Sequence, residues 1–89
     1  MGSCARHELK TWPVFFREVV ANRKTVEVRK DDRRFQVGDT LVLQEYSPSN
    51  DYYTGDVCER LVTHIVPGGQ FGIEQGYVAM SIRPAEESQ

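Results

Sequence analysis

Cysteine is scarce and long apolar runs are missing from this chain of 89 residues. The two cysteines, Cys4 and Cys58, form no CxxC pair, which argues against a disulfide framework and against a zinc site. No apolar stretch approaches the length of a membrane span, and no signal-peptide core is present. We therefore expect a cytoplasmic protein that binds neither a metal nor a membrane.

The chain also lacks the positive balance of proteins that coat nucleic acids, because its net charge is −2. Its charges are unevenly placed. Six of the eleven Lys and Arg residues fall between positions 23 and 34, whereas Glu86 and Glu87 place acid at the C-terminal end. This distribution predicts a locally basic face, which suits a small phosphate-bearing ligand or a short single strand better than a long duplex.

The chain does contain enough apolar residues for one core, since 39% of it is hydrophobic, with four Phe, four Tyr and one Trp. We predict a single domain over residues 7–83, preceded by a flexible segment at 1–6 and followed by a polar tail at 84–89. A short strand over 7–10 opens the domain, with Leu9 facing inward.

A helix over residues 11–21 is indicated by an apolar stripe at helical spacing. The stripe consists of Trp12, Phe15, Phe16, Val19 and Val20. Thr11 is the expected N-cap and Pro13 suits the first turn. Asn22 tolerates the left-handed backbone conformation that often ends a helix.

Four further strands are predicted over residues 25–30, 40–46, 56–66 and 77–82. The connection over 47–55 reads as a loop, and the one over 70–76 as a loop with a short helical turn. One helix with four or five short strands predicts an α+β fold, most simply a small closed or half-closed β-barrel plugged by the helix. The predicted core contains Trp12, Phe15 or Phe16, Val19, Leu41, Leu43, Leu61 and Met80.

Three charged residues, Lys24, Glu27 and Arg29, form a compact group where the helix gives way to the next strand. Alternation predicts Val26 and Val28 on one face of that strand. Thr25, Glu27 and Arg29 then share the other face, which we expect to be exposed. A carboxylate flanked by cations there can bind or polarise a polar ligand. The alternative is a solvated face on which Glu27 pairs with its neighbours at little energetic gain.

Several strings of residues resemble a known family. They are HELKTWP at 7–13, NRKTVEVRK at 22–30, FQVGDTLVLQEY at 35–46, YTG at 53–55 and GGQFGIEQGYVAM at 68–80. Together they resemble the small bacterial and phage domains of unknown function in the ASCH superfamily, whose fold is PUA-like. The superfamily signature is roughly G-x-K-x-x-E-x-R after the first helix, and Lys24, Glu27 and Arg29 match it. Asn22 replaces the glycine, and asparagine tolerates the same left-handed conformation.

The resemblance implies a β-barrel with a cleft beside the signature strand and a role in binding RNA or another nucleic acid. Some ASCH relatives look like amidohydrolases acting on acetylated cytidine, with a lysine and a threonine in the signature segment and a distant glutamate. Lys24 is present here, but Glu27 stands at the place of the threonine nucleophile. Thr25 is adjacent to Lys24 but should point to the opposite side of a regular strand from it.

Aromatic and histidine side chains supply the remaining candidates. Tyr52 and Tyr53 offer π-faces that can stack on bases, with packing onto the core as the alternative. Trp12 is assigned to the core because it falls on the apolar stripe. His64 is interpreted as structural rather than as a general acid or base. His7 has no second ligand at a metal spacing.

The expected function is therefore binding of RNA or a nucleotide-like ligand by a monomer, without a cofactor. Arg23, Lys24 and Arg29 would contact phosphate or polarise a base carbonyl. Glu27 would accept a base or ribose hydrogen bond and orient the cations, and Tyr52 or Tyr53 would stack on a base. One alternative is a hydrolase of a modified nucleoside, with Lys24 and Glu27 as the proton-transfer pair. Another is a phage or bacterial accessory interaction module.

Overall fold

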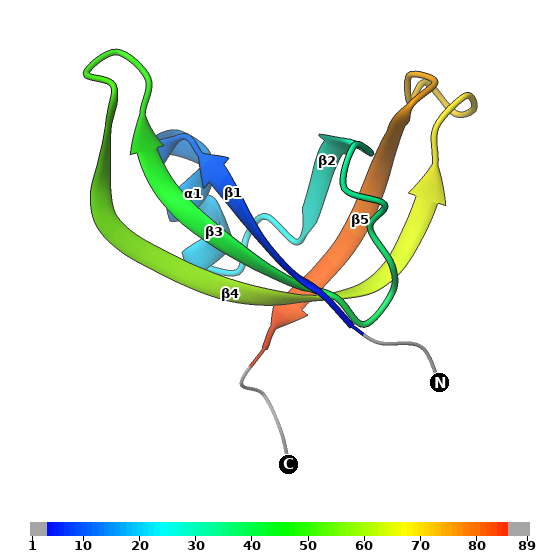
Figure 1. The fold of residues 1–89 in the computed structure, drawn as a ribbon, viewed down its shortest axis with the longest axis horizontal. Coiled ribbons are helices and arrows are strands. Elements are labelled where there is room, and N and C mark those ends of the chain that lie inside the picture. The colour runs from blue at the N-terminus through cyan, green and yellow to red at the C-terminus, as the bar shows by residue number, and fades with distance from the viewer. Residues whose placement is uncertain (1–3, 86–89) are drawn as a thin grey trace.

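A five-stranded sheet curls around one short helix in residues 4–85, the part of the chain that the computed structural model describes (Figure 1). The elements are β1 (Arg6–Thr11), α1 (Pro13–Val20), β2 (Val26–Lys30), β3 (Thr40–Ser47), β4 (Tyr52–Pro67) and β5 (Tyr77–Pro84). Their order and type agree with the sequence-based prediction. The first half of the predicted flexible segment and the acidic end of the predicted tail, with Glu86 and Glu87, lie outside the described residues.

The strands are ordered β1-β3-β4-β5-β2, so that β1 and β2 form the two edges of the sheet. β1 runs parallel to β3, and the other neighbouring strands are antiparallel. The 16-residue β4 bends through both halves of the curled sheet (Figure 1). Because the described edge strands do not pair with each other, the sheet stays open along the gap between β1 and β2, which we call the seam. The barrel-like α+β fold is therefore the half-closed form.

One hydrophobic core joins the helix to four of the strands. Its buried members are Leu9, Phe16, Val19, Phe35, Leu41, Leu43, Val62, Val78, Met80 and Ile82. Five of the predicted core residues are confirmed: Phe16, Val19, Leu41, Leu43 and Met80. The prediction for Leu61 is wrong, because Leu61 is only partly buried and Val62 is fully enclosed in its place. The pairing of β4 with β5 is irregular between Val62 and His64, which a strict two-residue alternation cannot anticipate.

The helix is shorter than predicted and begins at Pro13. Thr11 is not its N-cap but the last residue of β1, and Trp12 holds the N-cap position without a side-chain cap. With only eight residues, α1 buries Phe16 and Val19 alone. The rest of the predicted stripe is exposed, so the assignment of Trp12 to the core is wrong. Among residues 4–85, no helix is long and apolar enough to cross a membrane.

The left-handed turn predicted after the helix is confirmed, because Asn22 has a φ of 60°. Two other connections differ from the prediction. Tyr52 and Tyr53 belong to β4 rather than to a loop, since β3 and β4 extend to a short turn at 48–51. The 70–76 connection contains no helical turn, but a bridge between Gln70 and Ile73.

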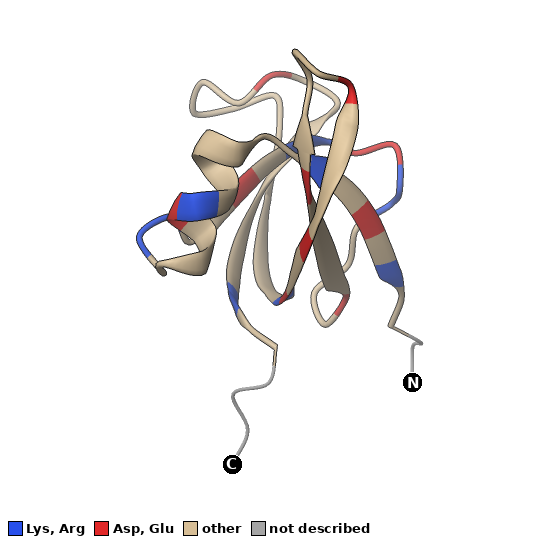
Figure 2. Cartoon of the chain, turned by 90° about the vertical axis from the view of Figure 1, so that its left-hand side faces the viewer, with Lys and Arg blue, Asp and Glu red and all other residues tan. Residues whose placement is uncertain are grey.

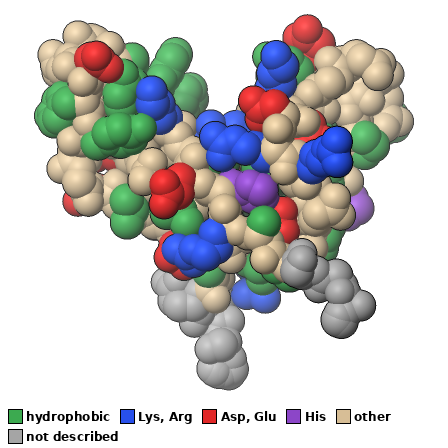
Figure 3. Space-filling model, viewed as in Figure 1, with side chains coloured by type: hydrophobic (Ala, Val, Ile, Leu, Met, Phe, Trp, Pro, Cys, Tyr) green, Lys and Arg blue, Asp and Glu red, His purple; other side chains and the backbone are tan. Residues whose placement is uncertain are grey.

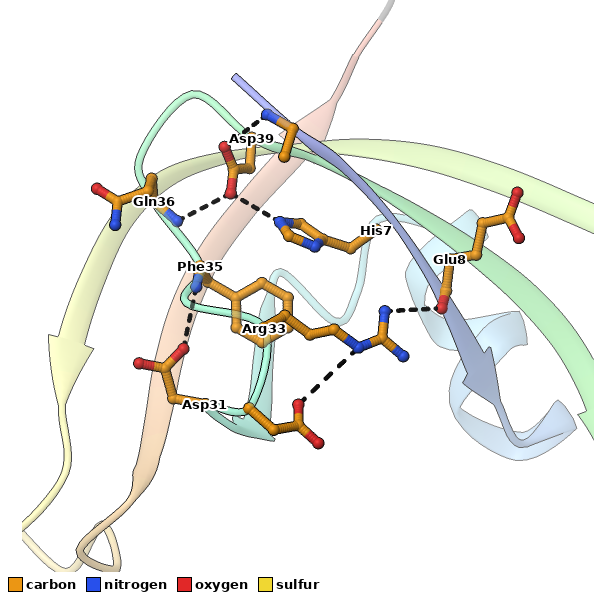
Figure 4. A network of polar contacts seen from close by, with 9 residues as sticks. His7, Glu8, Asp31, Arg33, Phe35, Gln36 and Asp39 are labelled. Carbon is orange, nitrogen blue, oxygen red and sulfur yellow. Dashed lines mark hydrogen bonds and ion pairs between the residues drawn. The ribbon is translucent and has the colours of Figure 1, made fainter. Parts of the chain in front are cut away.

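A buried polar network fixes the start of β1 to the loop before β3 (Figure 4). Asp39 is 1% exposed, pairs with His7 at 2.8 Å, and accepts hydrogen bonds from the backbone N–H groups of Ala5 and Gln36. Burial raises the pKa of Asp39, but the hydrogen bonds from Ala5, His7 and Gln36 outweigh it, so the pKa of this carboxyl lies below its usual range. The prediction of a structural histidine fails at His64, which is exposed, whereas His7 is buried.

Candidate functional site

A cavity of about 460 Å³ opens at the seam. One wall is formed by the end of β1 and the start of α1, and the other by β2 and the residues that lead into it. The lining residues are Lys10, Thr11, Trp12, Phe15, Lys24, Val26, Glu27, Val28 and Arg29. Figure 3 shows a notch between the two lobes of the molecule, with Lys and Arg side chains on both of its flanks. The signature residues therefore share one concave site with a segment that lies well before them in the sequence.

Glu27 is the centre of an ion-pair network in this cavity. Its side chain is 3% exposed, and its two oxygens accept hydrogen bonds from different cations. Lys24 Nζ donates to Oε2 at 2.5 Å, and Arg29 Nε donates to Oε1 at 2.9 Å. Because both oxygens have charged partners, burial of the carboxylate is compensated. The three residues together keep one surplus positive charge in the cavity.

Local backbone geometry brings these three side chains together. Glu27 and Arg29 are two residues apart and share a face of β2. The left-handed Asn22 turns the chain back, and the backbone N–H of Lys24 donates to the Glu18 carbonyl at 3.0 Å. Lys24 Nζ also donates to the carbonyl oxygen of Val26 at 2.5 Å, which holds the ammonium group beside Glu27.

The alternation predicted for this strand is confirmed, but the predicted exposure is wrong. Val26 and Val28 are 41% and 56% exposed, whereas Glu27 is buried. Glu27 pairs with Met80 of β5 in the ladder, so its side chain points to the core side of the sheet. The physical reason is that β2 is an edge strand whose inner face is filled by the ion-pair network instead of apolar side chains.

Arg29 connects the two edges of the sheet. Its Nη2 donates to Oγ1 of Thr11 at 3.3 Å, and Thr11 is 3% exposed at the end of β1. This hydrogen bond spans the seam and orients the guanidinium group. Among the residues that line the cavity, Thr11 supplies the one hydroxyl group, and that hydroxyl is already an acceptor for Arg29.

The opposite wall of the cavity is aromatic. The rings of Trp12 and Phe15 are stacked, with centroids 6.2 Å apart and an angle of 24° between their planes. They are 53% and 46% exposed, so much of this aromatic pair is open to a ligand. An apolar π-surface thus faces the cations of the network across a space large enough for a small planar ligand.

A third cation, Lys10, lies on the rim of the cavity and extends the site toward the β3–β4 hairpin. Its Nζ lies 4.4 Å from the centroid of the Tyr46 ring. Tyr46 in turn contacts Tyr53, with ring centroids 5.1 Å apart. The hydroxyl of Tyr46 donates a hydrogen bond to Asp51, which raises the pKa of Tyr46. Tyr53 therefore reaches the cavity only through this chain of contacts.

Comparison with known proteins places this chain in a family. The family described as a domain of unknown function, DUF3850, matches residues 6–82. The chain belongs to the DUF3850 family. It is also similar to the "uncharacterized 12.9 kDa protein in GpA 3′ region" of Escherichia phage P2, with 36% identity over 59 residues. That match covers 66% of this chain and 52% of the phage protein, so the chain spans about half the length of its relative.

The DUF3850 match contains the whole cavity, because every lining residue lies between Lys10 and Arg29. Of the predicted site residues, Lys24, Glu27 and Arg29 meet in it. Arg23 does not line it. Arg23 is exposed and pairs with Glu18 at 2.8 Å, and this hydrogen bond lowers the pKa of Glu18.

Six lining residues were not predicted as site residues: Lys10, Thr11, Trp12, Phe15, Val26 and Val28. One signal could have found the tryptophan. Proline favours the first position of a helix, so Pro13 fixes the helix start and leaves Trp12 outside the helical stripe. Lys10 and Thr11 carry no comparable signal, because their place depends on which strands form the edges of the sheet.

The charges outside the cavity form no single basic surface on the side shown in Figure 2, where acidic and basic residues are interspersed along the strands. Within residues 4–85, no group of three or more His, Cys, Asp or Glu side chains could hold a metal ion. The residues that line the cavity supply three cations, one carboxylate, one hydroxyl group and an aromatic wall.

Proposed function

We propose that the cavity binds a nucleotide, either free or within an RNA chain, and that this DUF3850 domain is a PUA-like member of the ASCH superfamily. The observation that carries the proposal is the juxtaposition of the Trp12–Phe15 π-surface with Lys24 and Arg29 across one cavity. A nucleotide has the matching parts, because a planar base can stack on the aromatic wall while a phosphate or base carbonyl meets the cations.

Each residue has a role in this proposal. Lys24 and Arg29 contact phosphate or a base carbonyl, and Lys10 adds a third cation at the rim. Glu27 orients the two inner cations, one through each of its oxygens. The stacking role that the sequence assigned to Tyr52 or Tyr53 passes to Trp12, which lines the cavity itself.

Binding is favoured over hydrolysis by the environment of the predicted proton-transfer pair. Lys24 Nζ donates to both Glu27 and the Val26 carbonyl, so two of its hydrogen bonds are already used within the protein. Thr25 is exposed and does not line the cavity, so it is poorly placed to act as a nucleophile there.

The chain offers a direct test because it contains a single tryptophan. Titration with uridine 5′-monophosphate should change Trp12 fluorescence saturably, whereas uridine alone should bind at least about tenfold more weakly because it lacks the phosphate. Lys24→Ala should weaken nucleotide binding about tenfold or more, since a charge-assisted hydrogen bond is lost.

Lys30→Ala is the matched control, because Lys30 is a lysine at the end of β2, the strand that follows Lys24, but does not line the cavity. It removes the same charge and should leave the affinity close to that of the wild type. No fluorescence change at millimolar nucleotide, or an equal loss in both variants, contradicts the proposal.

A further inference from the structure

We propose that the ligand of the cavity is a single-stranded oligonucleotide, and that its next base stacks on Tyr53 of the β3–β4 hairpin. This inference rests on the proposed function and names the class of ligand and the direction in which it leaves the cavity. It rests on three observations: a continuous chain of contacts, the exposure of Tyr53 and the arrangement of charge around the hairpin.

Lys10 provides the continuity. It lines the cavity and at the same time lies over the Tyr46 ring at 4.4 Å. In the parallel pairing of β1 with β3, Lys10 is opposite Gln44, and Tyr46 follows two residues later on the same face. A phosphate bound at Lys10 would therefore lie between the Trp12 wall and the tyrosines, where the backbone of a short strand must pass to place a base on each.

Tyr46 and Tyr53 have different parts in this surface. Tyr46 is partly buried and held on three sides, by Lys10, by Asp51 and by the Tyr53 ring. Tyr53 is 50% exposed, which leaves much of its side chain open to a ligand. The fixed Tyr46 supports the Tyr53 ring from one side, so Tyr53 loses little conformational freedom when a base stacks on it.

The neighbouring Tyr52 is excluded by the geometry of the strand. Tyr52 is 51% exposed, almost the same as Tyr53, but adjacent residues of a strand point to opposite faces of the sheet. Tyr53 pairs with Tyr46, whereas Tyr52 pairs with Ser47. Only Tyr53 therefore shares a face with Lys10 and Tyr46, and Tyr52 serves as an internal control of the same residue type and exposure.

The charge around the hairpin determines how the oligonucleotide is bound there. The acids Asp51 and Glu45 accept hydrogen bonds from Tyr46 and Thr54, and the cation Lys10 lies over the ring of Tyr46. With few cations, the hairpin should contribute stacking rather than phosphate contacts. Lengthening the ligand beyond one nucleotide should then raise its affinity with at most the salt dependence of one added phosphate contact, at Lys10.

The test compares uridine 5′-monophosphate with short oligouridylates and oligothymidylates, measured by Trp12 fluorescence at two salt concentrations. We expect affinity to rise about tenfold or more from the mononucleotide to the dinucleotide, as stacking of one further base provides. Tyr53→Leu should abolish this gain and leave mononucleotide affinity unchanged, and Tyr52→Leu should retain the gain. The two oligonucleotide series distinguish RNA from DNA as the source of the strand.

The inference fails if the mononucleotide binds but the dinucleotide binds no better, or if Tyr53→Leu retains the gain. The proposed function would stand in either case. If neither the mononucleotide nor any oligonucleotide binds, the proposed function and this inference are both wrong. A gain that disappears equally in Tyr52→Leu and Tyr53→Leu also overturns the assignment, because it indicates damage to the hairpin rather than loss of a stacking surface.

Discussion

At the scale of single residues, the site depends on a carboxylate that is buried only because two cations accompany it. Transfer of a lone carboxylate from water into a protein interior is strongly unfavourable. At Glu27 the cost is offset by Lys24 and Arg29, each of which bonds to a different oxygen. Removal of one partner therefore alters the remaining charges as well, and conservative replacements are more informative than alanine.

Replacement of Lys24 by arginine separates binding from catalysis. Arginine keeps the positive charge but does not deprotonate near neutral pH. In a binding site, Lys24→Arg should retain much of the nucleotide affinity that Lys24→Ala loses, as measured by Trp12 fluorescence. In a hydrolase, Lys24→Arg and Glu27→Gln should both abolish turnover. Hydrolysis of an acylated nucleoside by the wild type that is lost in Lys24→Arg would favour the enzyme instead.

The lowered pKa of Asp39 predicts how the stability of the protein depends on pH. Its pKa is lower in the folded protein than in the unfolded chain, so folding favours the ionised form. This contribution to stability is fully present above the unfolded pKa of about 4. It is lost as the pH falls through the lower folded-state pKa. Urea unfolding measured at a series of pH values should therefore show a loss of stability below about pH 4.

The variant Asp39→Asn should be less stable at neutral pH by about 1–3 kcal/mol, because it weakens hydrogen bonds to Ala5, Gln36 and His7. The stability of Asp39→Asn should also fall less than that of the wild type as the pH is lowered. Asp32→Asn, at an exposed carboxylate of the same loop, is the control and should keep the wild-type decline. An unchanged acid profile in Asp39→Asn would show that other carboxylates determine it.

At the scale of elements, α1 contributes to both the core and the cavity. The inner face, with Phe16 and Val19, packs into the core, and the N-terminal end presents Trp12 and Phe15 to the cavity. Hydrophobic periodicity predicted the helix but placed its apolar stripe on one buried face, with Trp12 in the core. Eight residues form little more than two turns, which bury two side chains here and leave Phe15 at the cavity.

The two adjacent phenylalanines of this helix should therefore respond differently to the same change. Phe16 is 6% exposed and Phe15 is 46% exposed. Phe16→Ala should lower the free energy of unfolding by about 3–5 kcal/mol through loss of core packing. Phe15→Ala should lower it by about 1 kcal/mol or less and should instead weaken nucleotide binding. Urea unfolding and Trp12 fluorescence titration measure the two effects, and a large stability loss in Phe15→Ala contradicts the assignment.

The strands show where prediction from sequence succeeds and where it stops. Alternation correctly placed Leu41 and Leu43 of β3, and Met80 of β5, in the core, because these strands are flanked by partners on both sides. It misjudged β2, where the side chain on the core side is Glu27. Sequence alternation identifies which residues share a face, but it does not determine whether ion pairs or apolar groups fill that face.

At the scale of the whole molecule, the open seam creates the site and also leaves two strand edges in need of protection. Unpaired strand edges invite association with other chains. Arginines cover the β1 edge at two points: Arg33 donates to the Glu8 carbonyl at 3.2 Å (Figure 4), and Arg29 donates to Thr11. The sequence indicated a barrel but not where it opens, because the opening depends on strand order rather than on any local pattern.

The distribution of charge over the whole molecule predicts how binding of an oligonucleotide depends on salt. With a net charge of −2, the molecule does not attract nucleic acid in bulk, so affinity must come from the cations at the cavity. Each phosphate contact on a single strand contributes about −0.7 to the slope of log K against log salt. One to three contacts, from Lys10, Lys24 and Arg29, then predict a slope between about −0.7 and −2 for oligouridylate.

Two variants that each remove one positive charge should have different effects on the slope of log K against log salt. Lys24→Ala should reduce its magnitude by about 0.7, because a phosphate contact in the cavity is lost. Arg23→Ala should leave it unchanged, since Arg23 pairs with Glu18 outside the cavity although it is only one residue away from Lys24. Equal reductions in both variants would mean that a diffuse basic surface binds the strand. Affinity that ignores salt, or no binding to oligouridylate at any salt concentration, would favour an accessory module that contacts other proteins.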